Sequence, residues 1–413
     1  MKSKLCFLNA SCFLQTQIFI LPVLFLFYQH CGLTVGDFFL FQGIFSLSAL
    51  LFEIPMGYLA DVFSKRNVLI LSYTFFLIRL LLWLFLAQYG YWILLIGEIL
   101  YAAQKASFAG VADSYIYEYL KFNHISDKMK KHYGTMNFFM SFGTAFSSLV
   151  GASVYAIISQ YTLKEYNYNY GFMALLGLEL ILNLTAIGLL FRLPQLPYLS
   201  RPQLTLKQTY NNLFRCIVWT MKNKNIKDYM FYSSLLVSIT SVFAWGFQPI
   251  MKLLLFPVSL YGIVYSINHI FRAICSLCSD KINRFISLPK MAILIFVLFV
   301  ICFILTFIVL NVPSLPIGVS LLYFIFVSLT IGGQLAFKIL HESRLHTFIP
   351  SKMRATASSI NTMIGRLYSG FFFILMKVLL DGASLQKSLA ICFTAFVLLA
   401  FPLRKVCLEK IEK

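Results

Sequence analysis

The sequence predicts an all-α membrane protein with twelve transmembrane helices, arranged as two pseudo-symmetric bundles of six. The composition is the first observation behind this prediction. Of 413 residues, 60% are hydrophobic and 12% are charged, whereas soluble domains average about 45–50% apolar and about 25% charged residues. The second observation is a repeat. The pattern Asp-x3-basic that closes one apolar run at Asp61 returns at Asp280, roughly half the chain length further on, and repetition at a fixed offset indicates a duplicated half.

Six helices are predicted in the first half, over residues 7–30, 35–60, 67–89, 91–120, 134–159 and 170–192. The second half has six more, over residues 228–251, 257–280, 288–311, 315–340, 354–380 and 384–404. Each is an apolar run bounded by charged residues, proline or glycine, and about 20 apolar residues are enough to cross a bilayer. The first run follows two lysines as a signal peptide would. It is too long for one and no small-x-small cleavage site follows it, so we expect a retained helix.

Between the two halves, residues 193–227 interrupt the apolar runs with three prolines and a basic segment. Apolar residues recur there on one face of a helix, at Leu206, Tyr210, Leu213, Phe214 and Ile217. A basic amphipathic helix is typical of the inner membrane surface. We therefore expect an N-terminal six-helix bundle (1–192), a cytoplasmic linker (193–227) and a C-terminal six-helix bundle (228–413). A helix that binds a soluble partner is the alternative for the linker.

The net charge of +19 indicates topology rather than a nucleic-acid partner. Lysine and arginine gather in alternate loops, and the opposite loops hold only Lys164, Lys252, Lys377 and Lys387. An excess of cations marks the cytoplasmic loops of membrane proteins. We therefore expect a multi-pass protein of the inner (plasma) membrane, embedded in the lipid bilayer as a monomer, with both termini in the cytoplasm.

The loop after the second predicted helix carries the most specific motif. Its spacing is Gly57-x3-Asp61-x3-Lys65-Arg66, and the second half repeats part of it as Asp280-x3-Arg284. The motif resembles the loop between helices 2 and 3 of the major facilitator superfamily of secondary transporters. That resemblance implies that the glycine lets helices approach closely and that the Asp and basic residues latch a cytoplasmic gate. Ser276 and Val62 depart from the family pattern.

Two further segments support the same resemblance, to a bacterial twelve-helix branch of the superfamily. The fourth predicted helix ends in an acidic stretch with Asp113 and Glu118, and Arg354-Ala-Thr opens the eleventh helix. The resemblance implies that the acidic end meets Lys65 and Arg66, and that Glu342 faces Arg284 in the second half. The alternative is that these are ordinary interfacial charges, each worth under about 1 kcal/mol.

Among the ionisable side chains inside predicted spans of the first half, the candidates for the transport path or for coupling are Arg79, Glu98, Lys105 and Glu179. A charge at mid-bilayer costs at least about 2.5–3.5 kcal/mol, so such charges pair or line a polar cavity. Glu98 and Lys105 are seven residues apart and so lie on one face of the helix. Arg79 requires a carboxylate, and either Glu98 or Glu179 can supply it.

Uncharged polar groups inside spans are the remaining candidates for the transport path. They are Gln15 and Gln17 in the first helix, Trp245 and Gln248 in the seventh, and Gln334 with the charged Lys338 in the tenth. The superfamily resemblance implies that helices 1, 4, 7 and 10 line the central path. Hydrogen bonds between helices are the alternative role for the amides.

Taken together, these features predict a secondary transporter that moves a small-molecule substrate by alternating access. Protons are the expected coupling ion, with Glu98 or Glu179 as the titrating carboxylate. Efflux and nutrient uptake both stay open, because the Gly-Pro motif of drug–proton antiporters is absent from the fifth helix. A transporter-like sensor or scaffold is the rival interpretation. We expect no enzyme activity, no cofactor and no metal site, because the sequence shows no nucleophile–base constellation, phosphate-binding loop or Cys/His cluster.

Overall fold

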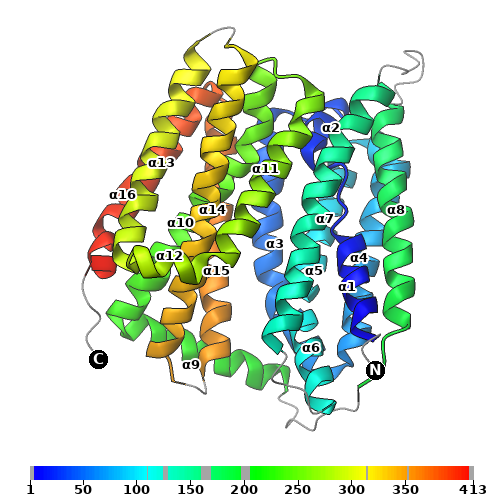
Figure 1. The fold of residues 1–413 in the computed structure, drawn as a ribbon, viewed down its shortest axis with the longest axis vertical. Coiled ribbons are helices and arrows are strands. Elements are labelled where there is room, and N and C mark those ends of the chain that lie inside the picture. Colours follow the sequence, from blue (N-terminus) through cyan, green and yellow to red (C-terminus); the bar gives the residue numbers. More distant parts are fainter. Residues whose placement is uncertain are drawn as a thin grey trace. The chain divides into compact units, whose positions relative to one another are not determined.

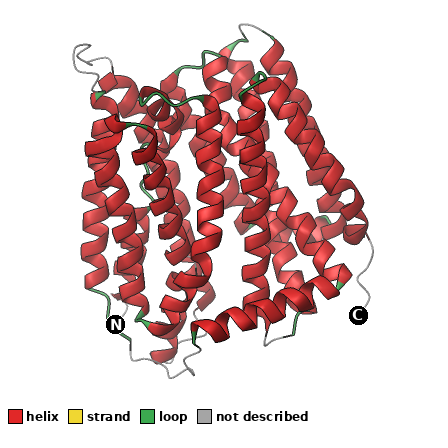
Figure 2. Ribbon diagram, turned by 180° about the vertical axis from the view of Figure 1, so that it is seen from behind, coloured by secondary structure: helices red, strands yellow, loops and turns green. Residues whose placement is uncertain are grey.

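The computed structural model describes residues 4–108, 110–123, 129–159, 169–196, 205–312, 315–350 and 353–408. These residues form helices and connecting loops, with no strand among them (Figure 2). Eight of the described helices are long and apolar enough to cross a membrane, and shorter apolar helices cover Leu5–Gln15 and Leu385–Ala400.

The predicted helices of the first half appear close to their expected positions. They are α1 (Lys4–Gln15), η1 (Leu21–Val23), α2 (Leu24–His30), α3 (Val35–Val62), α4 (Lys65–Leu86), η2 (Ala87–Tyr89), α5 (Tyr91–Phe108), α6 (Val111–Phe122), α7 (Met129–Ile158) and α8 (Tyr170–Phe191). Two of them begin at side-chain caps that satisfy free backbone N–H groups. Ser64 caps α4 by accepting from the Asn67 N–H, and Asn169 caps α8 by accepting from the Gly171 N–H.

The second half begins with the predicted amphipathic helix, which runs across the direction of the long helices in Figure 1. Its elements are α9 (Leu206–Lys222), α10 (Lys224–Leu253), α11 (Val258–Leu277), α12 (Ser279–Phe285), α13 (Leu288–Asn311), α14 (Ile317–Phe348), α15 (Arg354–Leu380) and α16 (Leu385–Leu408). On α9, Cys216 and Thr220 are buried, whereas the Phe214 side chain is 67% exposed. The apolar face of this helix is therefore only partly covered by protein.

The first predicted span is broken where the sequence suggested one continuous helix. The α-helix stops at Gln15, and a turn separates it from η1, which has Pro22 in its first turn. The Thr16 hydroxyl donates to the Cys12 and Phe13 carbonyls, which offers the backbone an alternative to helical bonding. The break leaves the Ile20 N–H available for a partner outside its own helix.

The fourth predicted span is also broken, at Gly110. This residue has φ +73°, a left-handed conformation that glycine adopts without steric cost. It separates α5 from α6, and the Gly110 carbonyl accepts the Ser114 N–H at 2.9 Å as α6 begins. The break sets a new direction for the acidic end of the span.

Contacts group the described chain into two compact units. Unit 1 comprises Met1–Thr34, Ser48–Leu206 and Pro257–Ser266, and unit 2 comprises Val35–Leu47, Lys207–Phe256 and Ile267–Lys413. The start of α3 is thus grouped with the second half, and the start of α11 with the first. The division at residues 193–227 stays a prediction.

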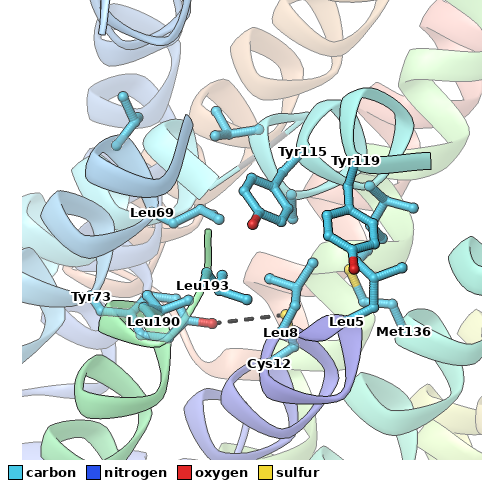
Figure 3. Close-up of a cluster of buried hydrophobic side chains, with 14 of the residues drawn as sticks. Leu5, Leu8, Cys12, Leu69, Tyr73, Tyr115, Tyr119, Met136, Leu190 and Leu193 are labelled. Carbon is cyan, nitrogen blue, oxygen red and sulfur yellow. Dashed lines mark hydrogen bonds between the residues drawn. The ribbon is translucent and has the colours of Figure 1, made fainter. Parts of the chain in front are cut away.

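In unit 1, α4 packs against α5 and α8, and α1 packs against α7 and α8. A cluster of buried apolar side chains joins α1, α4, α6 and α8, including Leu8, Leu69 and Leu190 (Figure 3). Two tyrosine hydroxyls of this cluster have hydrogen-bond acceptors nearby. The Tyr73 hydroxyl donates to the Cys12 sulfur at 3.8 Å, and the Tyr115 hydroxyl donates to the Pro194 carbonyl at 2.9 Å. This core fixes the end of unit 1 where α4 begins and α6 ends.

Two glycines let α7 approach the broken first span. A Cβ at Gly143 would lie 2.6 Å from the Thr16 hydroxyl oxygen, and a Cβ at Gly151 would overlap the Phe19 carbonyl. The two positions are eight residues apart, so they lie on the same face of α7. Backbone therefore packs against backbone at the break.

In unit 2, α10 packs against α14, α15 and α16, and α13 packs against α14 and α16. Serines on α10 fasten it to α15. The Ser234 hydroxyl donates to the Asn361 carbonyl at 3.2 Å, and the Ser238 hydroxyl donates to the Gly365 carbonyl at 3.1 Å. Small side chains and interhelical hydrogen bonds are the usual means of joining helices in membranes.

Candidate functional site: a buried charge cluster and two ion-pair clasps

Three buried side chains from three helices meet in unit 1. Nη2 of Arg79 on α4 lies 3.6 Å from Oε1 of Glu98 on α5, and both side chains are 2% exposed. The hydroxyl of Tyr28 on α2 donates to the same carboxylate oxygen at 2.6 Å. Of the two carboxylates considered as partners for Arg79, Glu98 is therefore the one in contact.

Aromatic rings hold the Arg79 guanidinium in place. Its central carbon lies 3.8 Å from the Trp83 ring centroid and 4.5 Å from that of Tyr101. A cation over an aromatic face is attracted by the quadrupole of the ring, more strongly where water is excluded. The Tyr28 ring packs edge-on against Trp83, with centroids 5.8 Å apart. The ion pair thus sits in a rigid apolar setting.

A second carboxylate, Glu179 on α8, reaches the same region. It is 1% exposed, and its Oε1 accepts the Ile20 N–H at 2.8 Å. That donor is available only because the first span breaks at this point. Its Oε2 has no hydrogen-bond partner among the described residues, and Arg79 lies within electrostatic range. One guanidinium therefore faces two buried carboxylates.

Lys105 lies outside this cluster. It is half-buried, and its Nζ is 5.0 Å from the Tyr101 ring centroid. The described residues show no ion pair between Lys105 and Glu98. Seven residues separate the two positions by about 10 Å along the helix axis, which is too far for direct contact, although both lie on one face of α5.

The two amides of the first span are buried at its break. The Gln17 side chain donates to the Phe13 carbonyl at 3.2 Å, and its Oε1 has no hydrogen-bond partner in the described part of the chain. The Nε2 of Gln15 is likewise unpartnered there. The Gln17 amide lies beside the close approach of Gly143.

An ion pair, called here the Lys65–Glu118 clasp, lies after the second predicted helix in unit 1. Nζ of Lys65, at the start of α4, lies 3.1 Å from Oε1 of Glu118 on α6. Arg66 donates from Nη1 to the Leu193 carbonyl at 3.1 Å. Among the described residues, a Cβ at Gly57 would meet nothing within 4 Å, and the close helix approach expected at this glycine stays a prediction. The side chain of Asp61 lies outside the described residues.

The remaining acidic residue of this region, Asp113, lies in the first turn of α6 and is half-buried. In the second half, Arg284 is exposed, and the described residues show no ion pair between it and Glu342. The Glu342 carboxylate accepts instead from the Ser358 hydroxyl at 2.5 Å. The side chains of Asp280 and Arg354 lie outside the described residues.

The path residues expected in the second half belong to α10 and α14 in unit 2. Trp245 is half-buried, with its ring centroid 5.8 Å from that of Phe38. Gln248 is fully buried one residue before Pro249, inside α10. On α14, the Nε2 of Gln334 has no partner among the described residues, and Lys338 lies one turn further on.

A second clasp was missed by the sequence analysis. Nζ of Lys377, near the end of α15, lies 2.7 Å from Oδ1 of Asp381 and 3.3 Å from Oδ1 of Asp37, in the first turn of α3. The Lys377–Asp381 spacing of four residues is a helical ion-pair signal that the sequence does contain. Its connection to Asp37 depends on tertiary structure. Gly36 makes room for it, because a Cβ there would lie 2.9 Å from Cδ of Lys377.

Comparison with known proteins relates this chain to a family. The family model described as Major Facilitator Superfamily matches residues 5–374. No curated protein matches the sequence.

Among solved structures, a mutant form of the nucleoside transporter NupG is similar with a TM-score of 0.78 and 15% identity, covering 97% of this chain and 99% of that chain. A bacterial homologue of the human lysosomal transporter Spinster has a TM-score of 0.72 and 13% identity, covering 98% of this chain and 95% of that one. A D-xylose–proton symporter has a TM-score of 0.67 and 16% identity, covering 97% and 95%.

At these identities the solved structures bear on fold alone, and the fold is the predicted one. It is all-α, with twelve membrane-spanning helices in two six-helix bundles, some of them broken as described above. The protein is thus an integral multi-pass membrane protein. The family model covers nearly the whole chain, and the chain therefore belongs to the Major Facilitator Superfamily.

Proposed function

We propose that this protein is a proton-coupled secondary transporter for a small solute, with Glu98 as the carboxylate that exchanges protons. Family membership supports transport of a small molecule, and one of the similar structures is named as a D-xylose–proton symporter. The observation that carries the proposal is the buried contact of Glu98 with Arg79 and Tyr28.

Charge counting explains why this cluster would hold a proton. With Arg79 charged and both Glu98 and Glu179 ionised, the cluster carries a net charge of −1 inside a membrane span. Uncompensated charge is costly there, so one bound proton makes the cluster neutral. The proton belongs to the coupled set rather than to one residue, and Glu98 exchanges it through its contacts with Arg79 and Tyr28.

Proton loss would change contacts between three helices. An ionised Glu98 attracts Arg79 of α4 and accepts from Tyr28 of α2, whereas a protonated Glu98 weakens its attraction for the guanidinium. Arg79 also lies within electrostatic range of Glu179 on α8. Its guanidinium can therefore move toward Glu179 when Glu98 is protonated, and back when Glu98 is ionised. Such a two-state element is what a coupling ion requires to bias a conformational change.

The two clasps are the contacts that fit gates of the transport path. Lys65–Glu118 joins α4 to α6 at the end that the charge asymmetry assigns to the cytoplasm. Lys377–Asp37 joins α15 to α3 within unit 2, where the charge asymmetry of the sequence predicts an outer face. In alternating access the helices at one end part while those at the other close, so each clasp would form and break once per cycle.

The first test compares wild type with Glu98→Gln in proteoliposomes, using solid-supported membrane electrophysiology and a panel of nucleosides and pentoses chosen from the named relatives. A transported solute is expected to evoke charge movement in wild type. A pH gradient should then drive its accumulation. Glu98→Gln mimics the permanently protonated carboxyl, so gradient-driven accumulation should fall to background while solute exchange without a gradient persists.

Glu118→Gln is the matched control, because it removes a carboxylate of the clasp and leaves the buried cluster intact. It should alter rates but retain accumulation driven by the pH gradient. Gradient-driven accumulation at the wild-type level in Glu98→Gln would contradict the assignment of this residue. The direction of the gradient that drives accumulation reports whether the protein is a symporter or an antiporter.

A further inference from the structure

The described residues of unit 1 form a pocket at the end where α2 and α4 finish and α8 begins. Its volume is about 380 Å³, and residues of all three helices line it. The floor is buried and aromatic, because the side chains of Phe27, Trp83 and Phe172 line it and each is at most 3% exposed. Cavities above about 300 Å³ that are lined by apolar rings and a few polar groups are typical of binding sites in proteins.

Packing between the rings fixes the shape of this floor. The Phe27 ring centroid lies 5.5 Å from that of Trp83 and 5.2 Å from that of Phe172. The Phe172 ring in turn stacks on Tyr155 of α7, with centroids 4.5 Å apart. These contacts hold the rings in place without an occupant, and a site organised in advance loses less entropy on binding.

The mouth of the pocket is polar. The side chains of His30 and Gln88 line the pocket and are exposed. Both carry groups that can hydrogen-bond to the oxygens of an ester or a lipid headgroup. The pocket therefore suits an occupant with an apolar body and a polar end.

The surroundings of the pocket indicate that it opens toward lipid. On α4, the side chains of Ile78, Leu81 and Phe85 lie on one face and are 39–59% exposed, as expected of a spanning helix that borders hydrocarbon. Beyond the end of α4, Tyr89 and Trp92 are each 70% exposed, and such rings mark the membrane–water interface. Phe85 also lines the pocket, so the pocket is continuous with the lipid-facing surface close to the interface.

The volume limits how much of a lipid the pocket can hold. It equals the space that roughly thirteen water molecules occupy in the liquid. A methylene group is close to a water molecule in volume. The pocket therefore has room for a segment of one acyl chain, and not for a whole phospholipid with two chains.

We propose that this pocket binds one acyl chain of a membrane lipid, with the ester and headgroup of the lipid at His30 and Gln88. The inference goes beyond the transport function, because it assigns a lipid site at the side of unit 1. Burial of apolar chain against the aromatic floor supplies the driving force. The occupant would border the buried charge cluster, since the Trp83 ring that it contacts lies 3.8 Å from the central guanidinium carbon of Arg79.

Tryptophan fluorescence provides the test, because the chain has four tryptophans and Trp83 is the one among the described lining residues. The full-length protein with Trp92, Trp219 and Trp245 replaced by Phe is reconstituted into vesicles of dioleoylphosphatidylcholine. Parallel vesicles contain the same lipid with bromine added across its double bonds. Bromine quenches indole fluorescence at short range, so a brominated chain in the pocket is expected to quench the buried Trp83. A second protein that keeps Trp92 in place of Trp83 reports the bulk bilayer.

Ala87→Phe and Met173→Phe fill the pocket from η2 and from α8. Each should at least halve the quenching of Trp83 by brominated lipid, because the added ring takes the place of the chain. Leu81→Phe is the matched control, since it enlarges an exposed side chain of α4 outside the described lining, and it should leave the quenching of Trp83 unchanged. None of the three substitutions should alter the quenching of Trp92.

Two results would overturn the proposal. Quenching of Trp83 that neither filling substitution reduces would show that the ring senses only bulk lipid. Stronger quenching of Trp83 by aqueous acrylamide than by brominated lipid would show that the pocket holds water or a water-soluble ligand. The two filling substitutions lie on different elements, so either folded variant gives the comparison. The measurement requires no solute movement, and failure of the transport proposal would leave its outcome unaffected.

Discussion

At the scale of single residues, Arg79 is the side chain on which the buried cluster depends. It is 2% exposed in the middle of α4, and it contacts one carboxylate and three aromatic rings. Removing one partner of a buried ion pair leaves an uncompensated charge, which is far more costly than removing both. The cluster should therefore behave as a unit when it is mutated.

Arg79→Gln is expected to destabilise the protein by about 3–5 kcal/mol, because Glu98 and Glu179 then lie buried without their cation. The double variant Arg79→Gln/Glu98→Gln should recover a large part of that loss, since one of the two carboxylates is also removed. The stabilities of the wild type, both single variants and the double variant, measured by thermal unfolding, form a double-mutant cycle. Additive losses would show that the two side chains do not interact.

The sequence predicted which residue types meet in this cluster, but not all of its members. An arginine inside a span requires a carboxylate, and that rule led to Glu98 and Glu179. Tyr28 carried no such signal, because one tyrosine among 23 is not distinguished by its type. The Asp37–Lys377 contact depends on how α3 meets α15. The described residues show no ion pair between Arg284 and Glu342, and the Glu342 carboxylate accepts from Ser358. Pairing across helices is decided by tertiary packing.

At the scale of elements, the broken helices are the features that serve the site. The break after Gln15 frees the Ile20 N–H for Glu179, and the break at Gly110 sets the direction of α6, which carries Glu118. Irregular backbone is tolerated at membrane depth only where other protein groups satisfy it. The first break meets that condition because α7 covers it with glycines.

Gly151→Ala is therefore expected to destabilise the protein by about 1–3 kcal/mol, because its methyl group would overlap the Phe19 carbonyl and push α7 from the break. Gly134→Ala, in the same helix, is the matched control. A Cβ there meets nothing within 4 Å, so that substitution should stabilise the helix by about 0.5–1 kcal/mol. Opposite signs in thermal unfolding are the expected result, and equal shifts would contradict the packing described here.

At the scale of the whole molecule, hydropathy and charge placement predicted the order of the helices almost completely. Long apolar runs such as α13, α14 and α15 appear with ends within a few residues of those expected, except that α14 extends to Phe348. Periodicity alone could not predict the breaks in the first and fourth spans, because Gln15-Thr16-Gln17 and Gly110 are short interruptions of apolar runs that are long enough to cross the bilayer as one helix. The distribution of lysine and arginine also predicts which ends of the helices face the cytoplasm, and the geometry of the helices does not contain that information.

That orientation gives a prediction for the intact protein in its membrane. Lys387, at the start of α16, is exposed at the end that the charge asymmetry assigns to the outside, and Lys281 on α12 is exposed at the other. Lys387→Cys should react with a membrane-impermeant maleimide on intact expressing cells, whereas Lys281→Cys should react only after permeabilisation. Wild type supplies the background from its nine native cysteines. The reverse pattern would mean that the cation-rich loops face outward, and the Lys65–Glu118 clasp would then close the outer end of the path rather than the cytoplasmic one.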